Sequence, residues 1–223
     1  MGRIARVVIA EYPYHITQRG NYKQKVFSNQ EDYKIYLGWI AEYSEKNKLS
    51  ILAYCLMPNH VHFIAIPEDS TSLARTFNLS HMRYSQYYNK KDDRIGHLWQ
   101  GRFFSTLLSK DHLYEAIRYV ENNPVKAKIV EESESWEWSS VRDHLDIRKK
   151  NIILKIADYR EHLQIENWRE YLKSKTDKNI EEEIKKNTKT GRPCGGESFI
   201  EKLEKILGRR LRALPEGRPS RGK

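Results

Sequence analysis

The chain has 223 residues, a formal net charge of +10 at pH 7 and a mean hydropathy of −0.80. A chain of this length can form one sizeable hydrophobic core, or a smaller core with an appendage, and we expect the second arrangement. The two cysteines, Cys55 and Cys194, fit no zinc-binding spacing and are too few for a disulfide framework. We therefore expect free thiols in a reducing compartment.

No apolar stretch of the sequence is long enough to cross a membrane. Near the N-terminus only residues 7–10 are continuously apolar, which is too short for a signal sequence. We therefore expect a cytoplasmic protein. The excess of positive charge makes an anionic polymer a better candidate partner than an acidic small molecule.

Strands and helices alternate over the first half of the chain. Apolar residues at every second position indicate the strands, apolar residues three or four positions apart indicate the helices, and turn residues mark the boundaries. The predicted elements are a strand over 12–18, a helix over about 28–46, strands over 50–57 and 60–66, a helix over about 71–89 and a strand over 102–108. Ser28 and Glu31 have the spacing of a capping box at the start of the first helix.

A further helix begins near Asp111, its expected cap, and ends at Pro124, because the residue before a proline avoids helical geometry. Its apolar stripe consists of Leu113, Ala116, Ile117 and Val120. The resulting order, β-α-β-β-α-β-α, predicts an α+β fold in which an antiparallel β-sheet has its helices packed on one face, as in the ferredoxin-like arrangement. The opposite face would then be free for a site.

Two histidines, His60 and His62, open the strand predicted over 60–66. Side chains on a strand alternate between faces, so both imidazoles project from one side while Val61 and Phe63 point into a core. This geometry suits a shared metal ion, but the same pattern also describes an ordinary half-buried strand with two polar residues. The pair alone leaves both interpretations open, and a metal site needs a further ligand from elsewhere.

The helix that ends at Pro124 carries a second candidate pair. Tyr119 and Asn123 are four residues apart, which places a hydroxyl and an amide oxygen on one ridge, at the border of the apolar stripe. If this helix packs near the two histidines, Asn123 can be a third metal ligand and Tyr119 can present its oxygen to a metal-bound phosphate. The alternative for Tyr119 is ordinary packing, since the chain has 14 tyrosines.

The C-terminal region is strongly basic. Residues 186–223 include eleven Lys or Arg against four Asp or Glu. A short amphipathic helix is predicted there, with Ser198 and Glu201 as a capping box and Gly208 as its C-cap. This helix can dock on the core or lie along a phosphate backbone, and a solvated face is an equal alternative. We divide the chain into a domain over residues 1–144 and a helical, basic, DNA-binding extension over residues 145–223.

Three ordered segments of the sequence carry a resemblance to a known family. They are Met57-Pro58-Asn59-His60-Val61-His62, Gly96-His97-Leu98-Trp99-Gln100-Gly101-Arg102-Phe103 and Tyr119-Val120-Glu121-Asn122-Asn123-Pro124-Val125-Lys126. Together they resemble the HUH single-strand transposases, and more closely the REP-associated tyrosine transposases, over about residues 1–144. The Gly191-Arg192-Pro193 segment and the helix after it are similar to a C-terminal extension of some members. Lys128 stands where such sequences commonly have glycine.

The resemblance implies an HUH endonuclease fold and a metal-dependent single-stranded DNA endonuclease and strand transferase, a transposase that cleaves at REP-like hairpins. His60 and His62 would bind a divalent ion with Asn123 completing the ligands. Tyr119 would be the nucleophile and would form a covalent 5′-phosphotyrosine. Mixed nitrogen and oxygen ligands with open positions suit Mg²⁺ or Mn²⁺. A monomer is expected rather than a homodimer, in the cytoplasm and associated with the nucleoid.

Aromatic and basic residues near these motifs are candidate DNA contacts. Trp99 beside Arg102 has the composition of a patch that stacks bases and binds phosphates, with core packing as an equal alternative. Arg218 lies in a Gly217-Arg218-Pro219 sequence that resembles the AT-hook core. The remaining candidates are all arginines: Arg3, Arg6, Arg19, Arg83, Arg209, Arg210 and Arg212.

Two other functions fit parts of the same sequence. A non-catalytic nucleic-acid-binding regulator derived from a transposase would use the same sheet and tail without cleaving DNA. A structural zinc protein would bind its ion through His60, His62 and either Cys55 or His97. The presence of all the expected catalytic residues favours the enzyme.

Overall fold

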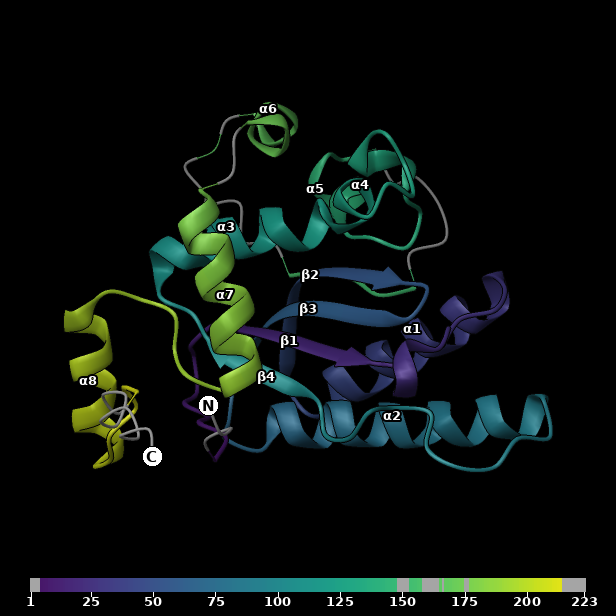
Figure 1. The fold of residues 1–223 in the computed structure, drawn as a ribbon, viewed down its shortest axis with the longest axis horizontal. Helices are drawn as coiled ribbons and strands as arrows, with labels where there is room; N and C mark the ends of the chain where they lie inside the picture. The colour runs from purple at the N-terminus through teal and green to yellow at the C-terminus, as the bar shows by residue number, and fades with distance from the viewer. Residues whose placement is uncertain (1–4, 148–152, 158–164, 166, 175–176, 214–223) are drawn as a thin grey trace, which may run out of the picture.

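The computed structural model describes residues 5–147, 153–157, 165, 167–174 and 177–213. Its centre is a four-stranded antiparallel sheet in the order β2-β3-β1-β4 (Figure 1). The strands are β1 (Tyr14–Arg19), β2 (Leu49–Met57), β3 (His60–Pro67) and β4 (Phe104–Leu107). This strand order is that of the ferredoxin-like arrangement, and the α+β class predicted from the sequence is confirmed.

One face of the sheet packs on α1 (Gln30–Lys46) and α2 (Ser72–Lys91). Strand residues on this face, among them Ile16, Val61 and Phe63, are fully buried with the two helices in one core. The start of α1 differs from the prediction by one residue. Asn29 is the N-cap, and it forms the capping box with Asp32.

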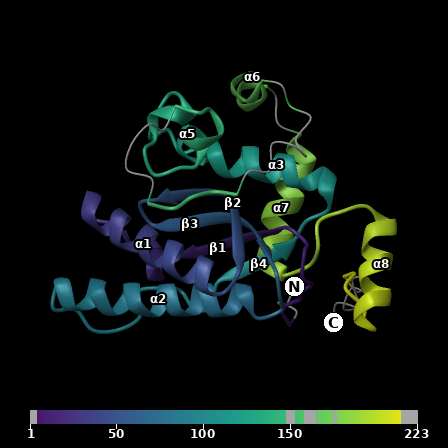
Figure 2. The same ribbon diagram turned by 180° about the vertical axis from the view of Figure 1, so that it is seen from behind.

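The opposite face is not open, because α3 (Lys110–Glu121) and α7 (Lys178–Thr190) pack on it. In both views α2 lies below the sheet and α3 lies above it (Figures 1 and 2). The expectation of helices on a single face is therefore wrong. The reason is that this face also carries apolar side chains, including Cys55, Met57 and Ile64, which need cover from water.

The helix α3 begins and ends close to its predicted limits. Its N-cap is Ser109 and not the predicted Asp111. The side chain of Ser109 accepts a hydrogen bond from the backbone N–H of His112. The helix stops at Glu121, and Pro124 then lies in the first turn of the short α4 (Asn123–Lys126), where proline is tolerated. Lys128 follows with a φ of 56°, a left-handed conformation that favours glycine.

The remaining elements are short. They are η1 (Asn21–Lys23), η2 (Ser133–Ser135), α5 (Val141–His144), α6 (Trp168–Lys173) and α8 (Glu197–Leu207). Gly208 is the left-handed C-cap of α8 as predicted, but the N-cap is Gly196, with no side-chain cap from Ser198. Among the described residues, no helix is both long and apolar enough to cross a bilayer.

The predicted C-terminal extension contributes to the main sheet. Cys194 pairs with Leu108 next to β4, and α7 packs on β4, α3 and β1. The division between residues 144 and 145 stays a prediction, but α7 and the strand-like segment after it cover the same core as α3. Within the extension, α7 therefore lies against the sheet face that carries the histidines, while Leu203 of α8 packs with the other core.

Replacing Ile117 by alanine should destabilise the protein through the core under α3. Ile117 is fully buried, and removal of a buried isoleucine side chain costs about 2–5 kcal/mol through lost burial and cavity formation. Ile95, which is fully exposed, is the matched control, and Ile95→Ala should change the free energy of unfolding by no more than about 0.5 kcal/mol. Urea unfolding followed by circular dichroism measures both. Equal losses for the two variants would contradict this packing.

Candidate active site

Three histidines lie together on the sheet face that α3 and α7 cover. The register pairs Arg19 with His60 and Thr17 with His62, so alternate residues of β1 and β3 share this face. The ring centroids of His60 and His62 are 5.0 Å apart, and those of His15 and His62 are 5.1 Å apart. The prediction that His60 and His62 project from one side, with Val61 and Phe63 in a core, is confirmed.

The helix α3 brings Tyr119 to these histidines. Its ring centroid is 5.7 Å from that of His62 and 5.8 Å from that of His15, with edge-on geometry in both cases. Asn123 lies one turn further along and donates from Nδ2 to the backbone oxygen of Tyr119 at 2.8 Å. The condition set by the sequence, that this helix must pack near the histidine pair, is therefore met.

Hydrogen bonds occupy one nitrogen of each histidine on β3. Nδ1 of His60 lies 2.6 Å from Oδ1 of Asn59, and Nδ1 of His62 lies 2.8 Å from Nε2 of His15. Burial, aided by the charge of Arg19, lowers the pKa of His60 to about 4. Burial and then the neighbouring His60 and His15 lower the pKa of His62 well below its usual value. Both imidazoles are thus neutral at pH 7, with Nε2 left for a ligand.

The donor chemistry of this site suits a divalent cation held by nitrogen and oxygen. Two neutral imidazoles are metal ligands, and the side chain of Asn123 is the nearby amide that can add an oxygen. In the described part of the chain, no three His, Cys, Asp or Glu side chains are placed to share an ion. This counts against the zinc alternative, because His60 and His62 lack a third partner from Cys55 or His97.

Charged side chains surround the ring of Tyr119. Nζ of Lys126 lies 5.1 Å and Nζ of Lys185 lies 5.6 Å from the ring centroid, and both lysines form ion pairs with Glu181. Burial, with a contribution from the charge of Glu181, raises the pKa of Tyr119 to about 12, while a hydrogen bond from Asn123 acts in the opposite direction. At pH 7 the phenol is therefore protonated.

Arg19 is the predicted DNA contact that lies at this site. Its side chain is exposed at the end of β1, on the histidine face. Its charge lowers the pKa of His60, of His62 and of Tyr119, which places the guanidinium within electrostatic reach of all three. This is the position from which a cation can contact an anion bound at the histidines.

Three other predicted DNA contacts have partners elsewhere in the fold. Trp99 is 7% exposed and donates from its indole nitrogen to the backbone of His81, so its ring is a core residue and not a base-stacking surface. Arg6 lies over the ring of Phe103 at 3.6 Å. Arg83 on α2 donates to the hydroxyl of Tyr43 and is 3.7 Å from Glu42, on the other side of the sheet.

The remaining candidates lie at the surface or outside the described residues. Arg102 is exposed. Arg209 donates to the backbone of Ala5, Arg210 to that of Ala213, and Arg212 forms an ion pair with Glu201 at 3.0 Å. Arg3 and Arg218 lie outside the described residues.

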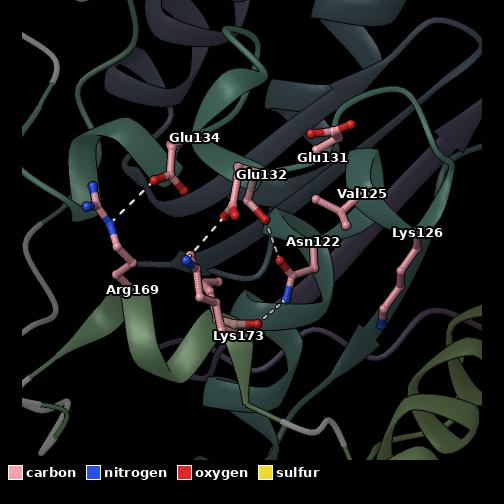
Figure 3. A pocket seen from close by; sticks show the side chains of 10 residues that line it. Asn122, Val125, Lys126, Glu131, Glu132, Glu134, Arg169 and Lys173 are labelled. Carbon is pink, nitrogen blue, oxygen red and sulfur yellow. Dashed lines mark hydrogen bonds and ion pairs between the residues drawn. The ribbon is translucent and has the colours of Figure 1, made fainter.

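A pocket of about 320 Å³ lies next to the C-terminal end of α3 (Figure 3). Its charged lining residues largely pair with one another: Arg169 is 3.4 Å from Glu134, and Lys173 is 3.6 Å from Glu132. Neither the three histidines nor Tyr119 line it. The candidate active site is therefore the covered sheet face and not this pocket.

Five residues of β1, α4 and α7 belong to the site although no role was predicted for them from the sequence. They are His15, Lys126, Glu181, Lys185 and Thr188. The spacing of His15, Thr17 and Arg19 at every second residue indicates that they share one face of a strand. Only the pairing of β1 with β3 shows that this face adjoins His62. No local pattern indicates that α7 returns to the sheet.

Comparisons with known proteins identify a family and a shared fold. Residues 8–123 match the family model described as transposase, IS200-like. A structure of a REP-associated tyrosine transposase bound to a REP hairpin has 20% sequence identity, a TM-score of 0.54, and alignment over 71% of this chain and 93% of its own. A candidate transposase from Deinococcus radiodurans has 20% identity and a TM-score of 0.36, over 54% and 96%. A search of curated proteins gave no match.

The family model covers the strands that carry the histidines, the helix α3 that carries Tyr119, and Asn123 at the start of α4, while the first of the two structures has the same fold. The chain belongs to the IS200-like transposase family.

Proposed function

We propose that this protein is a metal-dependent single-stranded DNA endonuclease and strand transferase that acts through a covalent 5′-phosphotyrosine. The observation that carries the proposal is the position of Tyr119 on α3, whose ring centroid lies 5.7 Å from that of His62, with Asn123 four residues further on at the start of α4. A nucleophile, imidazole nitrogens and an amide on one surface are the components that such a reaction needs.

His60 and His62 would hold the ion through Nε2, and Asn123 would add its amide oxygen. Mg²⁺ or Mn²⁺ fits this mixed ligand set best. When bound, a divalent ion acts as a Lewis acid that polarises the scissile phosphate. Arg19 would contact the same phosphate from the end of β1 and orient it toward Tyr119.

In the reaction, the phenolic oxygen of Tyr119 attacks the phosphorus, the bond from phosphorus to the 3′-oxygen breaks, and the phenolic proton leaves to solvent or to the departing oxygen. The DNA is left with a free 3′-hydroxyl and a 5′-phosphate attached to Tyr119. The phosphodiester energy is retained in this link, so a second 3′-hydroxyl can reverse the step without ATP. Cleavage and strand transfer can thus use one site.

The substrate would be single-stranded at the cleaved bond. Tyr119 is 7% exposed at the flank of a packed helix, so the phosphate has to come to the covered sheet face, out of duplex geometry. The fold shared with a transposase that was solved with a REP hairpin supports a REP-like hairpin as the recognised structure. We further propose that the protein acts as a monomer at the nucleoid in the cytoplasm.

Replacing Tyr119 by phenylalanine should abolish the covalent adduct while hairpin binding persists, because the hydroxyl is lost and the ring is kept. His60→Ala should also abolish cleavage, by removing an ion ligand. The measurement is a denaturing gel after incubation with Mn²⁺ and a panel of single-stranded REP-like hairpins. Tyr114→Phe, on the same helix, is the matched control and should cleave normally.

Wild-type protein that binds hairpins but forms no adduct with any of them would overturn the enzyme proposal. That result would instead support the non-catalytic regulator, which predicts salt-dependent binding without cleavage.

Replacing Glu181 by glutamine should move the pH-rate profile of cleavage to lower pH. The carboxylate of Glu181 helps raise the pKa of Tyr119 to about 12, so its removal favours the phenolate at any given pH. A decrease in pKa of about half a unit to one unit gives about 3- to 10-fold more phenolate. Single-turnover adduct formation measured from pH 6 to pH 10 tests this. Exposed Glu182→Gln removes the same charge one residue away and should leave the profile in place.

Replacing Arg19 by alanine should weaken hairpin binding and lower its salt dependence. Each phosphate contact contributes about 0.7–0.9 to the slope of log affinity against log salt concentration. Arg83→Ala is the comparison, since Arg83 contacts Tyr43 and Glu42 on the other side of the sheet, and the slope should not change. Fluorescence anisotropy over a salt series measures both, and equal slopes in the two variants would contradict the role of Arg19.

A further inference from the structure

A buried series of hydrogen bonds links α7 to the histidine pair. Oγ1 of Thr188 lies 2.8 Å from Nδ1 of His15, and Nε2 of His15 lies 2.8 Å from Nδ1 of His62. Oγ1 of Thr188 also donates to the backbone oxygen of Ile184 at 2.6 Å. All three side chains of this Thr188–His15–His62 network are at most 6% exposed, so water does not compete strongly for these bonds.

The direction of the Thr188 hydrogen bond to Ile184 determines which ring nitrogens of His15 and His62 carry a proton. A backbone carbonyl can only accept, so the single proton of the Thr188 hydroxyl points to Ile184. The same oxygen must then accept the proton on Nδ1 of His15. His15 is 1% exposed, and its two ring nitrogens face a hydroxyl and another imidazole, neither of which is an anion that would stabilise a second ring proton. The single proton of the neutral ring is therefore the one on Nδ1, and Nε2 is an acceptor. His62 must therefore donate from Nδ1.

We propose that Thr188, acting through His15, is a positioning residue that holds His62 in the tautomer with its proton on Nδ1. The lone pair of His62 is then fixed on Nε2, the nitrogen that the proposed function assigns to the ion. Partners of this kind, bonded to the other nitrogen of a ligating histidine, set its tautomer and ring orientation. The inference rests on the proposed function for the role of His62 as a ligand.

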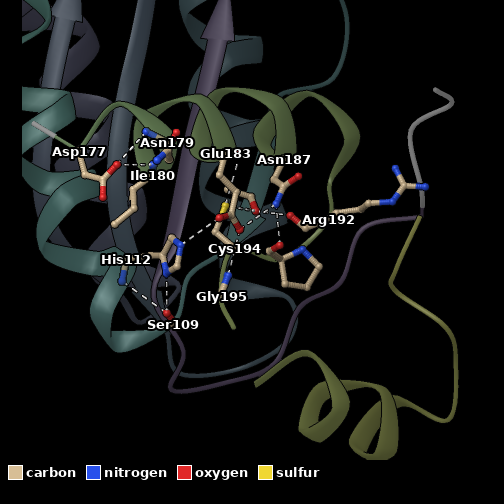
Figure 4. Close-up of polar contacts among 12 residues, drawn as sticks. Ser109, His112, Asp177, Asn179, Ile180, Glu183, Asn187, Arg192, Cys194 and Gly195 are labelled. Carbon is tan, nitrogen blue, oxygen red and sulfur yellow. Dashed lines mark hydrogen bonds and ion pairs between the residues drawn. The ribbon is translucent and has the colours of Figure 1, made fainter. Parts of the chain in front are cut away.

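The rotation of α7, which sets the position of Thr188, is fixed by polar contacts on its other residues (Figure 4). Glu183 lies 3.3 Å from Nε2 of His112 on α3 and accepts from the backbone of Gly195. Asn187 donates to the backbone oxygen of Pro193 at 2.8 Å, and Cys194 donates to that of Leu107 next to it in the sheet. The C-terminal region is thereby attached to both α3 and β4.

This arrangement gives the C-terminal region a role within the site itself. The HUH histidines come from β3, but the group that determines which of the two His62 nitrogens is unprotonated comes from residue 188. The network predicts that metal affinity depends on a hydroxyl at this position, even though Thr188 touches neither the ion nor the DNA.

The tautomer can be measured in the metal-free protein. Long-range ¹H–¹⁵N correlation spectra distinguish a protonated from an unprotonated ring nitrogen, and wild-type His62 should carry its proton on Nδ1. In Thr188→Val, which keeps the side-chain shape, His15 loses its acceptor and can place its proton on Nε2. His62 should then shift toward the tautomer protonated on Nε2. Thr188→Ser should retain the wild-type pattern.

Mn²⁺ binding, measured by electron paramagnetic resonance of the free ion, tests the consequence. The Thr188→Val variant should bind Mn²⁺ at least about 10-fold more weakly, the effect typical of losing such a partner, and Thr188→Ser should bind normally. Thr190→Val is the matched control, because the Thr190 hydroxyl donates to Asn187 of its own helix and is not part of the Thr188–His15–His62 network. Resonances of His81, buried in the other core, report whether each variant is folded.

The possible results separate the two proposals. A wild-type His62 protonated on Nε2, or an unchanged His62 tautomer in folded Thr188→Val, would overturn the network. Wild-type protein that shows the expected tautomers but binds no Mn²⁺ would contradict the proposed metal-dependent function, while supporting the network as the control of the His62 tautomer.

Discussion

The pairing register of β1 with β3 is the constraint on which the site depends. It sets Thr17 opposite His62 and Arg19 opposite His60, so His15, His62 and Arg19 share one face. Because side chains on strands alternate, a shift of one residue would turn both histidines of β3 into the core under α1 and α2. The apolar side chains of Val61 and Phe63 oppose this shift, since they would leave the core and be placed beside His15 and Arg19.

The second constraint is the rotation of α3 about its axis. Glu121 is fully buried on the flank of the helix opposite Tyr119, where it accepts from Ser140 at 2.6 Å, His144 at 2.6 Å and Trp168 at 2.7 Å. Leaving any of these buried groups unpaired would cost free energy, so α3 cannot turn freely. The same contacts that satisfy Glu121 therefore direct Tyr119 toward the histidines.

Local patterns were sufficient for the main strands and helices up to residue 121, while the roles of the four proposed chemical residues came from the resemblance carried by the three motifs. Period two placed His60 and His62 on one side, and helical spacing placed Tyr119 with Asn123. What the sequence could not supply depends on contacts between distant segments. The position of α7, the role of His15 and the burial of Trp99 follow from tertiary packing, and the second helical layer follows from apolar residues on a face that was expected to be open.

Burial of the site favours the uncharged forms of its histidines and of Tyr119. The environment that keeps His15, His60 and His62 neutral also raises the pKa of Tyr119 and holds it as a phenol. A desolvated site disfavours every charged form, whether imidazolium or phenolate. A buried phenol becomes a better nucleophile when nearby positive charge stabilises the phenolate. In the proposed reaction, Arg19 already supplies part of that charge, and a divalent ion held by His60 and His62 would add to it.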